Sequence, residues 1–421
     1  MEALIHYIWK YKLYDSGILK TTSDLPVLVI DPGIHNIHAG PDFFNAKIRI
    51  GNEIWAGNIE IHSFASDWIK HNHHIDKAYN SVVLHVVEYS DTEVQSENGH
   101  IIPQLILKIP EKIKDNYEYL LSRDILVPCL SQIGNIPKLY LTDWINTLLI
   151  ERLERKTDDL YQLLKEYKNN WGEVFYITLS RNFGFGINND AFERLARNLP
   201  LRYILKHKNS ILQVEALFFG QAGLLDSDVN EDDYYFSLKK EYDFLRQKFD
   251  LKPLEAHIFK SLRIRPNNFP HIKIAQLAEL VRTQESLFSK MLELEDIQAL
   301  RGLFISELNE YWHTHYQFGR ISSKKIKKIG LSAQNIILIN TVVPVLFAYG
   351  KAKQLPHLQE KAIQLLETIK PESNYLVNEF TKVGIQPCHA GDSQALIQLQ
   401  KEYCEKKKCI FCRIGHKLLS K

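Results

Sequence analysis

Hydrophobic and polar residues alternate, or apolar residues form short runs, in five segments between residues 26 and 109. Both patterns are typical of β-strands. The five segments read VLVIDPG, FFNAKIRIG, EIWAGNIEIHS, SVVLHVVEYS and IIPQLILKI. Gly33, Gly40 and Gly51 separate them, and the sequence IGNE predicts a hairpin turn between the second and third strands.

Two segments with a helical pattern accompany these strands. Residues 1–12 are amphipathic, and residues 66–80 lie between the third and fourth strands. Ser66 or Asp67 is suited to cap the second of these helices, because a side-chain oxygen there accepts hydrogen bonds from the first turn. The order of helix, three strands, helix and two strands predicts a small α/β domain over residues 1–127.

The pattern changes after a linker at residues 128–137. Apolar residues then recur at helical spacing, as in residues 141–167 and 232–249. No repeat of fixed length is visible in this part. We therefore expect a larger, all-α domain over residues 138–380, followed by a cysteine-rich tail over residues 381–421.

Composition indicates a folded globular protein, because 45% of the 421 residues are hydrophobic and 24% are charged. The most apolar stretch, residues 336–349, contains Asn340 and Pro344 and is shorter than the roughly 20 residues that cross a bilayer. We therefore expect no membrane partner. The first residues lack the pattern of an export signal, which favours a cytoplasmic location. Since the net charge is only +2, nucleic-acid binding would depend on local charge.

Candidate catalytic residues lie on consecutive predicted strands. Asp42 begins one strand, and Glu60 and His62 lie on the next. Residues two apart on a strand point to the same face, so two carboxylates and an imidazole converge if the strands pair here. Such oxygen ligands suit Mg²⁺ or Mn²⁺, and an ion held in this way activates water for phosphodiester hydrolysis.

These residues resemble the signature of the PD-(D/E)XK nuclease superfamily. Pro41 and Asp42 match its PD, and Glu60, Ile61 and His62 match its (D/E)XK with histidine in place of lysine. The resemblance covers roughly the first 110 residues. It implies a restriction-endonuclease-like core in which Asp42 and Glu60 bind metal, with the Ile61 carbonyl as a further ligand. His62 is suited to act as base, metal ligand or water-positioning group, or it marks an inactive site.

Histidine is concentrated around these residues, with eight of the chain's 17 between His35 and His100. The resemblance implies that the helix after the (D/E)XK strand supplies a group to the scissile phosphate, and His71 is the candidate for this role. For His73 we expect a solvated surface position. For His85, inside VVLHVV, we expect a buried, hydrogen-bonded side chain. The alternating polar face of an ordinary sheet accounts for the same residues without chemistry.

Four of the five cysteines lie in the tail, at the spacing C-x15-C-x4-C-x2-C. They are Cys388, Cys404, Cys409 and Cys412. Such a set is typical of a tetrahedral thiolate site. The occupant is Zn²⁺ or a [4Fe-4S] cluster, since both use four cysteines. For Cys129 we expect a place in the core or linker.

Basic residues accompany the cysteines. Residues 401–421 contain seven lysines and arginines against two glutamates. A second basic group comprises Arg320, Lys324, Lys325, Lys327 and Lys328, near the aromatic residue Trp312. Such charge suits a phosphate backbone, although lysine runs are usually solvated surface. We therefore expect nucleic acid, DNA or RNA, as the partner.

Over nearly its whole length the chain resembles an uncharacterised bacterial family defined only as a domain of unknown function. The segments that carry this resemblance include GPDFFNAKI, GNIEIHSFASDWIKHNH, RPNNFPHIKIAQLA and YCEKKKCIFCRIG. The leading hypothesis is a metal-dependent nuclease with Asp42 and Glu60 as metal ligands and His62 and His71 in catalysis. The alternatives are an inactive nucleic-acid-binding or scaffold protein of nuclease-like fold, and a metal-dependent hydrolase of another substrate.

Overall fold

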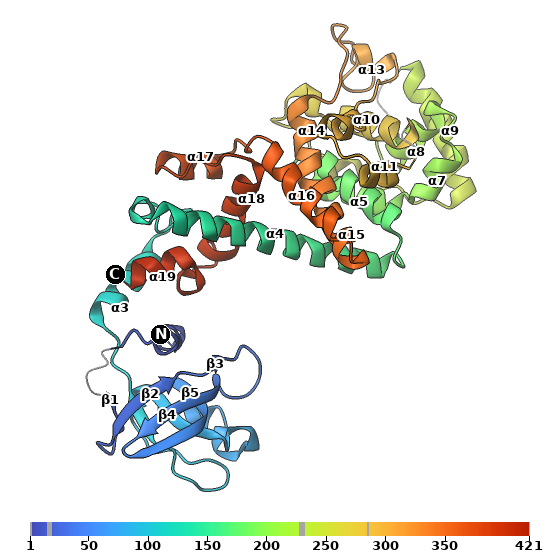
Figure 1. Cartoon of the computed structure of the whole chain (residues 1–421). Coiled ribbons are helices and arrows are strands. Elements are labelled where there is room, and N and C mark those ends of the chain that lie inside the picture. The colour runs from blue at the N-terminus through green and yellow to red at the C-terminus, as the bar shows by residue number, and fades with distance from the viewer. Residues whose placement is uncertain (1, 15–18, 227–231, 284–285, 421) are drawn as a thin grey trace. The chain divides into compact units, whose positions relative to one another are not determined.

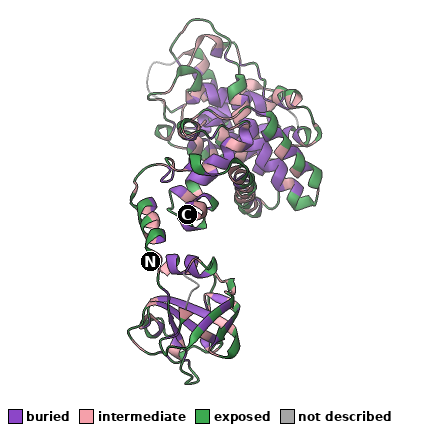
Figure 2. Cartoon of the chain, turned by 60° about the vertical axis from the view of Figure 1, so that its left-hand side comes forward, coloured by how far each residue is buried: buried purple, intermediate pink, exposed green. Residues whose placement is uncertain are grey.

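The chain folds into two compact units in a computed structural model that describes residues 2–14, 19–226, 232–283 and 286–420 (Figure 1). The first unit comprises Met1–Trp144, Lys382–Ile385 and Leu399–Lys421, and the second comprises Ile145–Thr381 and Gln386–Gln398. Buried residues fill the interior of each unit (Figure 2). Residues from Leu399 onward fold with the N-terminal part of the chain, whereas the sequence suggested a separate tail over residues 381–421.

The first unit contains one mixed sheet of seven strands. The strands are β1 (Leu19–Lys20), β2 (Pro26–Asp31), β3 (Ile34–His35), β4 (Phe43–Ile50), β5 (Glu53–Phe64), β6 (Val82–Tyr89) and β7 (Gln104–Ile106). Their order is β1-β2-β4-β5-β6-β7, and β3 pairs with β4. The pairs from β1 to β5 are antiparallel, and β5, β6 and β7 are parallel. The five segments expected as strands contain β2, β4, β5, β6 and β7, so that prediction is confirmed.

Strand β5 is long enough to use two sets of neighbours. Its first half forms the predicted hairpin with β4, where Ile50 faces Glu53 and Gly51 has φ 59. A positive φ at the first turn position is typical of type II′ hairpins. Its second half pairs with β6, where Glu60 faces His85. This second half is buried, which places Glu60 and His62 in the interior of the unit.

The expected helix over residues 66–80 is wrong. A single α-turn, α2 (Asp67–Lys70), is followed by two 3-10 turns, η1 (His73–Ile75) and η2 (Lys77–Tyr79). Asn72 interrupts the helix with φ 64, a left-handed conformation that asparagine tolerates. Asp76 then caps η2 by accepting a hydrogen bond from the Ala78 N–H at 2.9 Å. These two residues break the helix, and His73 becomes buried instead of solvated.

The other helices of the first unit precede or follow the strands in the sequence. They are α1 (Glu2–Lys10), α3 (Glu111–Ser122), η3 (Ile133–Asn135), the π-helix η7 (Leu399–Cys404), η8 (Cys409–Phe411) and α19 (Arg413–Leu419). Helix α1 packs against β5 and buries Leu4, Ile8 and Trp9 completely. The Tyr7 hydroxyl lies 2.8 Å from His416 Nδ1, which joins α1 to α19.

The second unit is helical, as the periodicity predicts. Its helices begin with α4 (Lys138–Glu166), α5 (Trp171–Phe183), α6 (Asn189–Asn198), α7 (Leu201–Lys206), α8 (Ile211–Gln221), α9 (Asp233–Phe249), η4 (Ala256–Ile258), η5 (Pro266–Asn268) and α10 (Pro270–Thr283). They continue with α11 (Leu287–Glu293), α12 (Ile297–Gly302), α13 (Tyr311–Thr314), α14 (Leu331–Ile337), the π-helix η6 (Leu338–Val342), α15 (Val343–Lys353), α16 (Pro356–Thr368), α17 (Tyr375–Lys382) and α18 (Ala390–Gln398). The unit boundary falls within α4.

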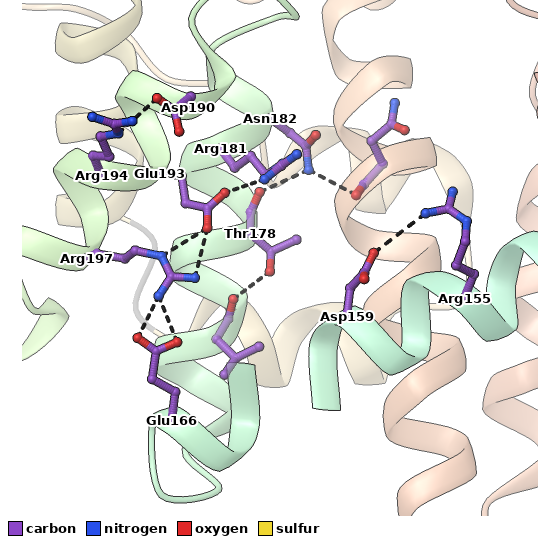
Figure 3. Close-up of polar contacts among 12 residues, drawn as sticks. Arg155, Asp159, Glu166, Thr178, Arg181, Asn182, Asp190, Glu193, Arg194 and Arg197 are labelled. Atoms are coloured by element: carbon purple, nitrogen blue, oxygen red, sulfur yellow. Dashed lines mark hydrogen bonds and ion pairs between the residues drawn. The ribbon is translucent and has the colours of Figure 1, made fainter. Parts of the chain in front are cut away.

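Helices α14, η6 and α15 form one continuous apolar helix, Leu331–Lys353, of 23 residues. By length and composition it is long enough to cross a bilayer, so the expectation that this stretch is too short is wrong. However, 67% of its most apolar window is buried inside the unit, as in the core helix of a soluble protein, so support for a membrane span is weak. Pro344 has no N–H for the Asn340 carbonyl. The Asn182 side-chain amide donates to that carbonyl instead, at 2.9 Å (Figure 3).

Ion pairs connect three helices of the second unit (Figure 3). Arg197 of α6 donates to both carboxylate oxygens of Glu166 in α4, at 2.7 and 2.8 Å. Arg197 also pairs with Glu193 at 2.9 Å, and Glu193 pairs with Arg181 of α5. Arg197 therefore joins α4 to α6 through one nitrogen, Nη1, and Glu193 extends the link to α5.

Candidate functional site

Two carboxyl groups of the first unit meet through reciprocal hydrogen bonds to the backbone. Glu60 Oε2, from β5, accepts a hydrogen bond from the Asp42 N–H at 3.1 Å. Asp42 Oδ2, just before β4, accepts one from the Ile61 N–H at 2.9 Å. The antiparallel pairing of Phe43 with Ile59 sets this register. The carboxyl groups therefore lie together on one side of the sheet, as the strand order suggested.

Burial of this pair makes it electrostatically unfavourable without a cation. Glu60 is only 4% exposed. Burial, followed by the negative charge of Asp42, raises the pKa of Glu60 well above its usual range. Two close carboxylates cannot both ionise cheaply in a low-dielectric site. A positive charge placed beside them would restore the ionised form of Glu60.

His6 is a neighbour of the pair that the sequence did not reveal. It lies on α1, and its Nε2 is 3.3 Å from Asp42 Oδ2. Burial lowers the pKa of His6, but the hydrogen bond and negative charge of Asp42 outweigh burial and raise it overall. The only signal in the sequence is a histidine inside an amphipathic segment, which does not identify its partner.

Three histidines form a cluster beside Glu60. Nitrogens of His62, His71 and His73 all lie within 4.8 Å of one another, and this is the only such group of potential metal ligands among the described residues. Glu60 Oε1 lies 3.5 Å from His62 Nε2 and 3.2 Å from His73 Nε2. His73, expected on the solvated surface, instead lies buried beside Glu60. The group comprises three imidazoles and one carboxylate.

Buried residues hold the orientation of this cluster. His85, fully buried on β6, has its Nε2 2.9 Å from His62 Nδ1, so its expected buried, hydrogen-bonded state is confirmed. His73 stacks on Tyr79 with ring centroids 3.8 Å apart, and Trp68 meets the edge of the same imidazole. A histidine that binds metal usually has its second nitrogen held in this way.

Burial favours the neutral form of the His62 and His73 imidazoles. Burial and the neighbouring His73 and His71 lower the pKa of His62 to about 4. Burial lowers the pKa of His85 to about 3 and lowers that of His73. Neutral imidazole is the form that binds metal ions. At neutral pH the His62 imidazole therefore carries no positive charge.

The donor atoms determine which ions fit. Imidazole ligands suit Zn²⁺, Fe²⁺, Cu²⁺ and Ni²⁺ best, and Mn²⁺ accepts them more readily than Mg²⁺, which prefers oxygen ligands alone. Two ligands of one ion lie at most about 4.4 Å apart when each bond is about 2.0–2.2 Å. The spread of the His62, His71 and His73 nitrogens, within 4.8 Å, is close to that limit. Of Mg²⁺ and Mn²⁺, the donor set therefore favours Mn²⁺.

The four cysteines of the expected tail site do not belong to one unit. Cys388 is exposed and lies in the second unit, where its N–H donates to Asp392 Oδ2 at 2.7 Å. Cys404, Cys409 and Cys412 lie in the first unit. Cys129, expected as a core or linker residue, lines a small cavity together with these three. Cys388 therefore lies in a different unit from the other three cysteines of the predicted site.

Several of the basic residues are engaged in structural contacts. The Lys327 ammonium is buried and donates to the backbone carbonyls of Trp312 and His313. Trp312 is fully buried and offers no surface for stacking. In the tail, Arg413 pairs with Asp143, and Lys406 pairs with Glu402. Lys401 and Lys408 remain on the surface, and Lys421 lies outside the described residues.

The chain belongs to the family described as protein of unknown function (DUF2851), whose model matches residues 2–375. This match confirms the family resemblance seen in the sequence. It includes Asp42, Glu60 and the histidine cluster and ends before the C-terminal cysteines. No curated protein and no solved structure matches the chain.

Proposed function

We propose that the chain is a metal-dependent nuclease whose first unit resembles the PD-(D/E)XK type. The observation that carries this proposal is the Asp42–Glu60 pair, in which the buried Glu60 lies beside the imidazole cluster of His62, His71 and His73. The strand arrangement, three antiparallel strands followed by parallel β6, is compatible with such a core. An ion bound to this donor set would lower the pKa of a bound water and neutralise charge on the phosphate.

The residues of the site have separate tasks in this proposal. Glu60 Oε1, His62 and His73 would hold the ion from the buried side, since they are the least exposed donors. His71 is exposed and marks the side from which substrate enters. Asp42 positions Glu60 through its backbone N–H and stays beside the ion. His62 acts as a ligand rather than as a base, because its second nitrogen is used by His85.

His6 would supply the charge that the absent lysine gives in the resembling family. Its side chain is paired with Asp42, and the pairing raises its pKa. A protonated imidazole there lies next to the acidic pair and can donate a proton or a hydrogen bond to a phosphate oxygen. His6 is therefore the residue that we assign to the substrate phosphate or the leaving group.

Nucleic acid is the proposed substrate because exposed basic residues belong to the same unit. Lys401 and Lys408 are examples that lie on the surface near the C-terminus. Positive side chains of this kind bind the phosphate backbone without reading sequence. We propose no preference between DNA and RNA.

The second candidate is a catalytically inactive nucleic-acid-binding or scaffold protein. The specific observation that favours it is the internal pairing of both carboxyl groups. Glu60 accepts from the Asp42 N–H, Asp42 accepts from the Ile61 N–H, and His6 pairs with Asp42. A site stabilised in this way can persist without metal.

Cleavage assays distinguish the two functions. The full chain, treated with chelator, would be incubated with plasmid DNA, single-stranded DNA and structured RNA in Mn²⁺, Mg²⁺ or Zn²⁺. We expect Mn²⁺-dependent cleavage that falls by about 100-fold or more in Glu60→Gln, the scale of losing an electrostatic stabiliser. His100→Ala, an exposed histidine of the same unit, is the control and should cleave normally. Cleavage unchanged in Glu60→Gln refutes the assignment, and binding without cleavage under all conditions supports the scaffold protein.

A further inference from the structure

Four cysteines of the first unit surround one small cavity. Cys129, Cys404, Cys409 and Cys412 line a space of about 20 Å³, together with apolar residues such as Leu120 and Leu399. A space of this size exceeds what one water molecule needs, about 10–15 Å³. Cys129, Cys404 and Cys412 are buried, and Cys409 is half-buried. The described part of the chain has no disulfide among them.

Different elements present the four thiols. Cys129 lies in the loop after α3, Cys404 ends η7, Cys409 begins η8, and Cys412 is the N-cap of α19. Gly415 lets α19 approach the turn before it, because a Cβ there would lie 2.0 Å from the Cys409 carbonyl oxygen. This close approach between α19 and the preceding turn helps to bring the thiols to one cavity.

The thiols are close enough to affect one another. Burial raises the pKa of Cys129 to about 12, and Cys412 and Cys409 add to this effect. Burial also raises the pKa of Cys404, with Cys129 as the next contribution. Burial raises the pKa of Cys412 as well.

The distances between the thiols distinguish Zn²⁺ from an iron–sulfur cluster as the occupant. Four thiolates around one Zn²⁺ lie about 3.8 Å apart, because each Zn–S bond is about 2.3 Å in a tetrahedral site. Among the described residues no three cysteine sulfurs lie within 4.8 Å of one another. Three of the cysteines also follow the spacing C-x4-C-x2-C, which is used by iron–sulfur proteins with a fourth cysteine elsewhere in the chain.

We propose that Cys129, Cys404, Cys409 and Cys412 bind an iron–sulfur cluster that fastens the C-terminal segment to the N-terminal part of the first unit. This assignment replaces Cys388 by Cys129 and selects iron–sulfur over zinc. It is independent of the nuclease proposal, since none of its ligands touches the histidine cluster in the contacts of the described residues.

Metal analysis of the full chain tests this proposal. The protein would be isolated without oxygen, and its iron, zinc and acid-labile sulfide would be measured with its visible absorption. We expect iron and sulfide in equal amounts, a broad visible band and little zinc. Cys129→Ala should lower the iron content by roughly tenfold or more, because removal of a ligand costs at least as much as loss of an outer-shell partner. Cys388→Ala is the matched control and should keep its iron.

Three results would overturn the assignment: zinc without sulfide, no metal at all, or iron lost in Cys388→Ala and kept in Cys129→Ala. If Cys129→Ala does not fold, alkylation of the wild-type chain provides the test. In the iron-loaded protein, iodoacetamide should modify Cys388 and leave the other four cysteines protected. After oxidation and chelation of the iron, those four should become reactive. Modification of Cys129 while iron is still bound contradicts the proposal.

Discussion

His85 determines which nitrogen of His62 faces the cluster. When His62 Nδ1–H donates to His85 Nε2, 2.9 Å away, the lone pair of His62 Nε2 points toward Glu60 and His71. His71 Nδ1 lies only 3.1 Å from the same nitrogen, so the metal-free cluster needs one proton between the two rings. A bound ion would replace that proton. The proton displaced from His71 Nδ1 moves to Nε2 of the same ring, so the proton released on metal binding should be that of Glu60, whose pKa is raised.

Replacement of His85 should weaken metal binding through His62. His85→Phe keeps the buried volume and removes the acceptor for His62 Nδ1–H, and we expect Mn²⁺ affinity to fall by about 10–100-fold. His85→Gln restores an acceptor and should recover most of the affinity. Calorimetric titration of the chelated protein with Mn²⁺ measures the effect, with His100→Ala as control. Equal affinity in His85→Phe and wild type would contradict the role of His85.

The raised pKa of Glu60 makes a prediction about stability and pH. A carboxyl whose pKa is raised on folding contributes stability below its unfolded pKa, and that contribution is lost as pH rises through the folded value. Ionisation of Glu60 should therefore destabilise the folded, chelated wild-type protein as the pH rises from 5 to 8. Glu60→Gln cannot ionise, and at pH 8 it should be more stable than chelated wild type by about 1–3 kcal/mol, since each pKa unit is about 1.4 kcal/mol.

Thermal or urea denaturation in chelator measures this difference at both pH values. The difference in free energy of unfolding between Glu60→Gln and wild type should be smaller at pH 5. Mn²⁺ should stabilise only the wild type. The neutral histidines act in the opposite direction, because their lowered pKa values cost stability as pH falls toward 4. They are present in both proteins and cancel in the comparison. A Glu60→Gln protein that is less stable than wild type at pH 8 in chelator would show that Glu60 is ionised without metal.

At the residue scale, the sequence identified those groups whose neighbours are set by strand pairing. Asp42, Glu60 and His62 lie on adjacent paired strands, so alternation and order were enough to bring them together. His6 and His73 were not identified as neighbours of the site, because their positions depend on how α1 packs and on where the helix after β5 breaks. Those features follow from tertiary contacts and from a single left-handed residue, Asn72.

At the scale of elements, strands were predicted well because buried and exposed residues alternate along β2 and β4 and a buried run dominates β6. The segment after β5 was predicted wrongly as one helix. The Asp76 side chain caps the short turn η2, and this local hydrogen bond competes with a continuous helix. The helix from Leu331 to Lys353 shows the reverse case. There, Pro344 does not end the helix, because Asn182 satisfies the carbonyl that proline leaves without a donor.

Arg197 should contribute measurably to the packing of α4 and α6. Arg197→Lys keeps the charge but cannot reproduce the contacts of three separate nitrogens, Nη1 with Glu166 and Nε and Nη2 with Glu193, and we expect the second unit to lose about 1 kcal/mol. Arg194→Lys is a matched control, because Arg194 makes an exposed pair with Asp190 within one helix. Urea denaturation of the full chain measures both. Equal stability of the two variants would mean that the simultaneous contact of Arg197 with Glu166 and Glu193 adds nothing.

At the scale of the whole molecule, the division into units could not be read from composition. Cys129 and Cys404 lie far apart in the sequence and meet only because residues from Leu399 onward fold with the first unit. Spacing along the chain favoured Cys388, which is nearer in sequence but belongs to the second unit. Local sequence patterns predict the helices and strands. Contacts between helices and strands that are distant in the sequence decide which side chains share a site.

The two units have separate cores, so metal binding at the histidine cluster should stabilise them unequally. Mn²⁺ at about 100 times its dissociation constant should add about 2.7 kcal/mol to a unit that binds it only when folded. Hydrogen exchange of the full chain, followed by mass spectrometry, should show slower exchange in peptides from β4 to β6 and little change in α5, α8 and α10. Glu60→Gln should abolish the difference. Slowing of equal size in both units would contradict a site confined to the first, because stabilisation by mass action reaches only the structure that unfolds with the site.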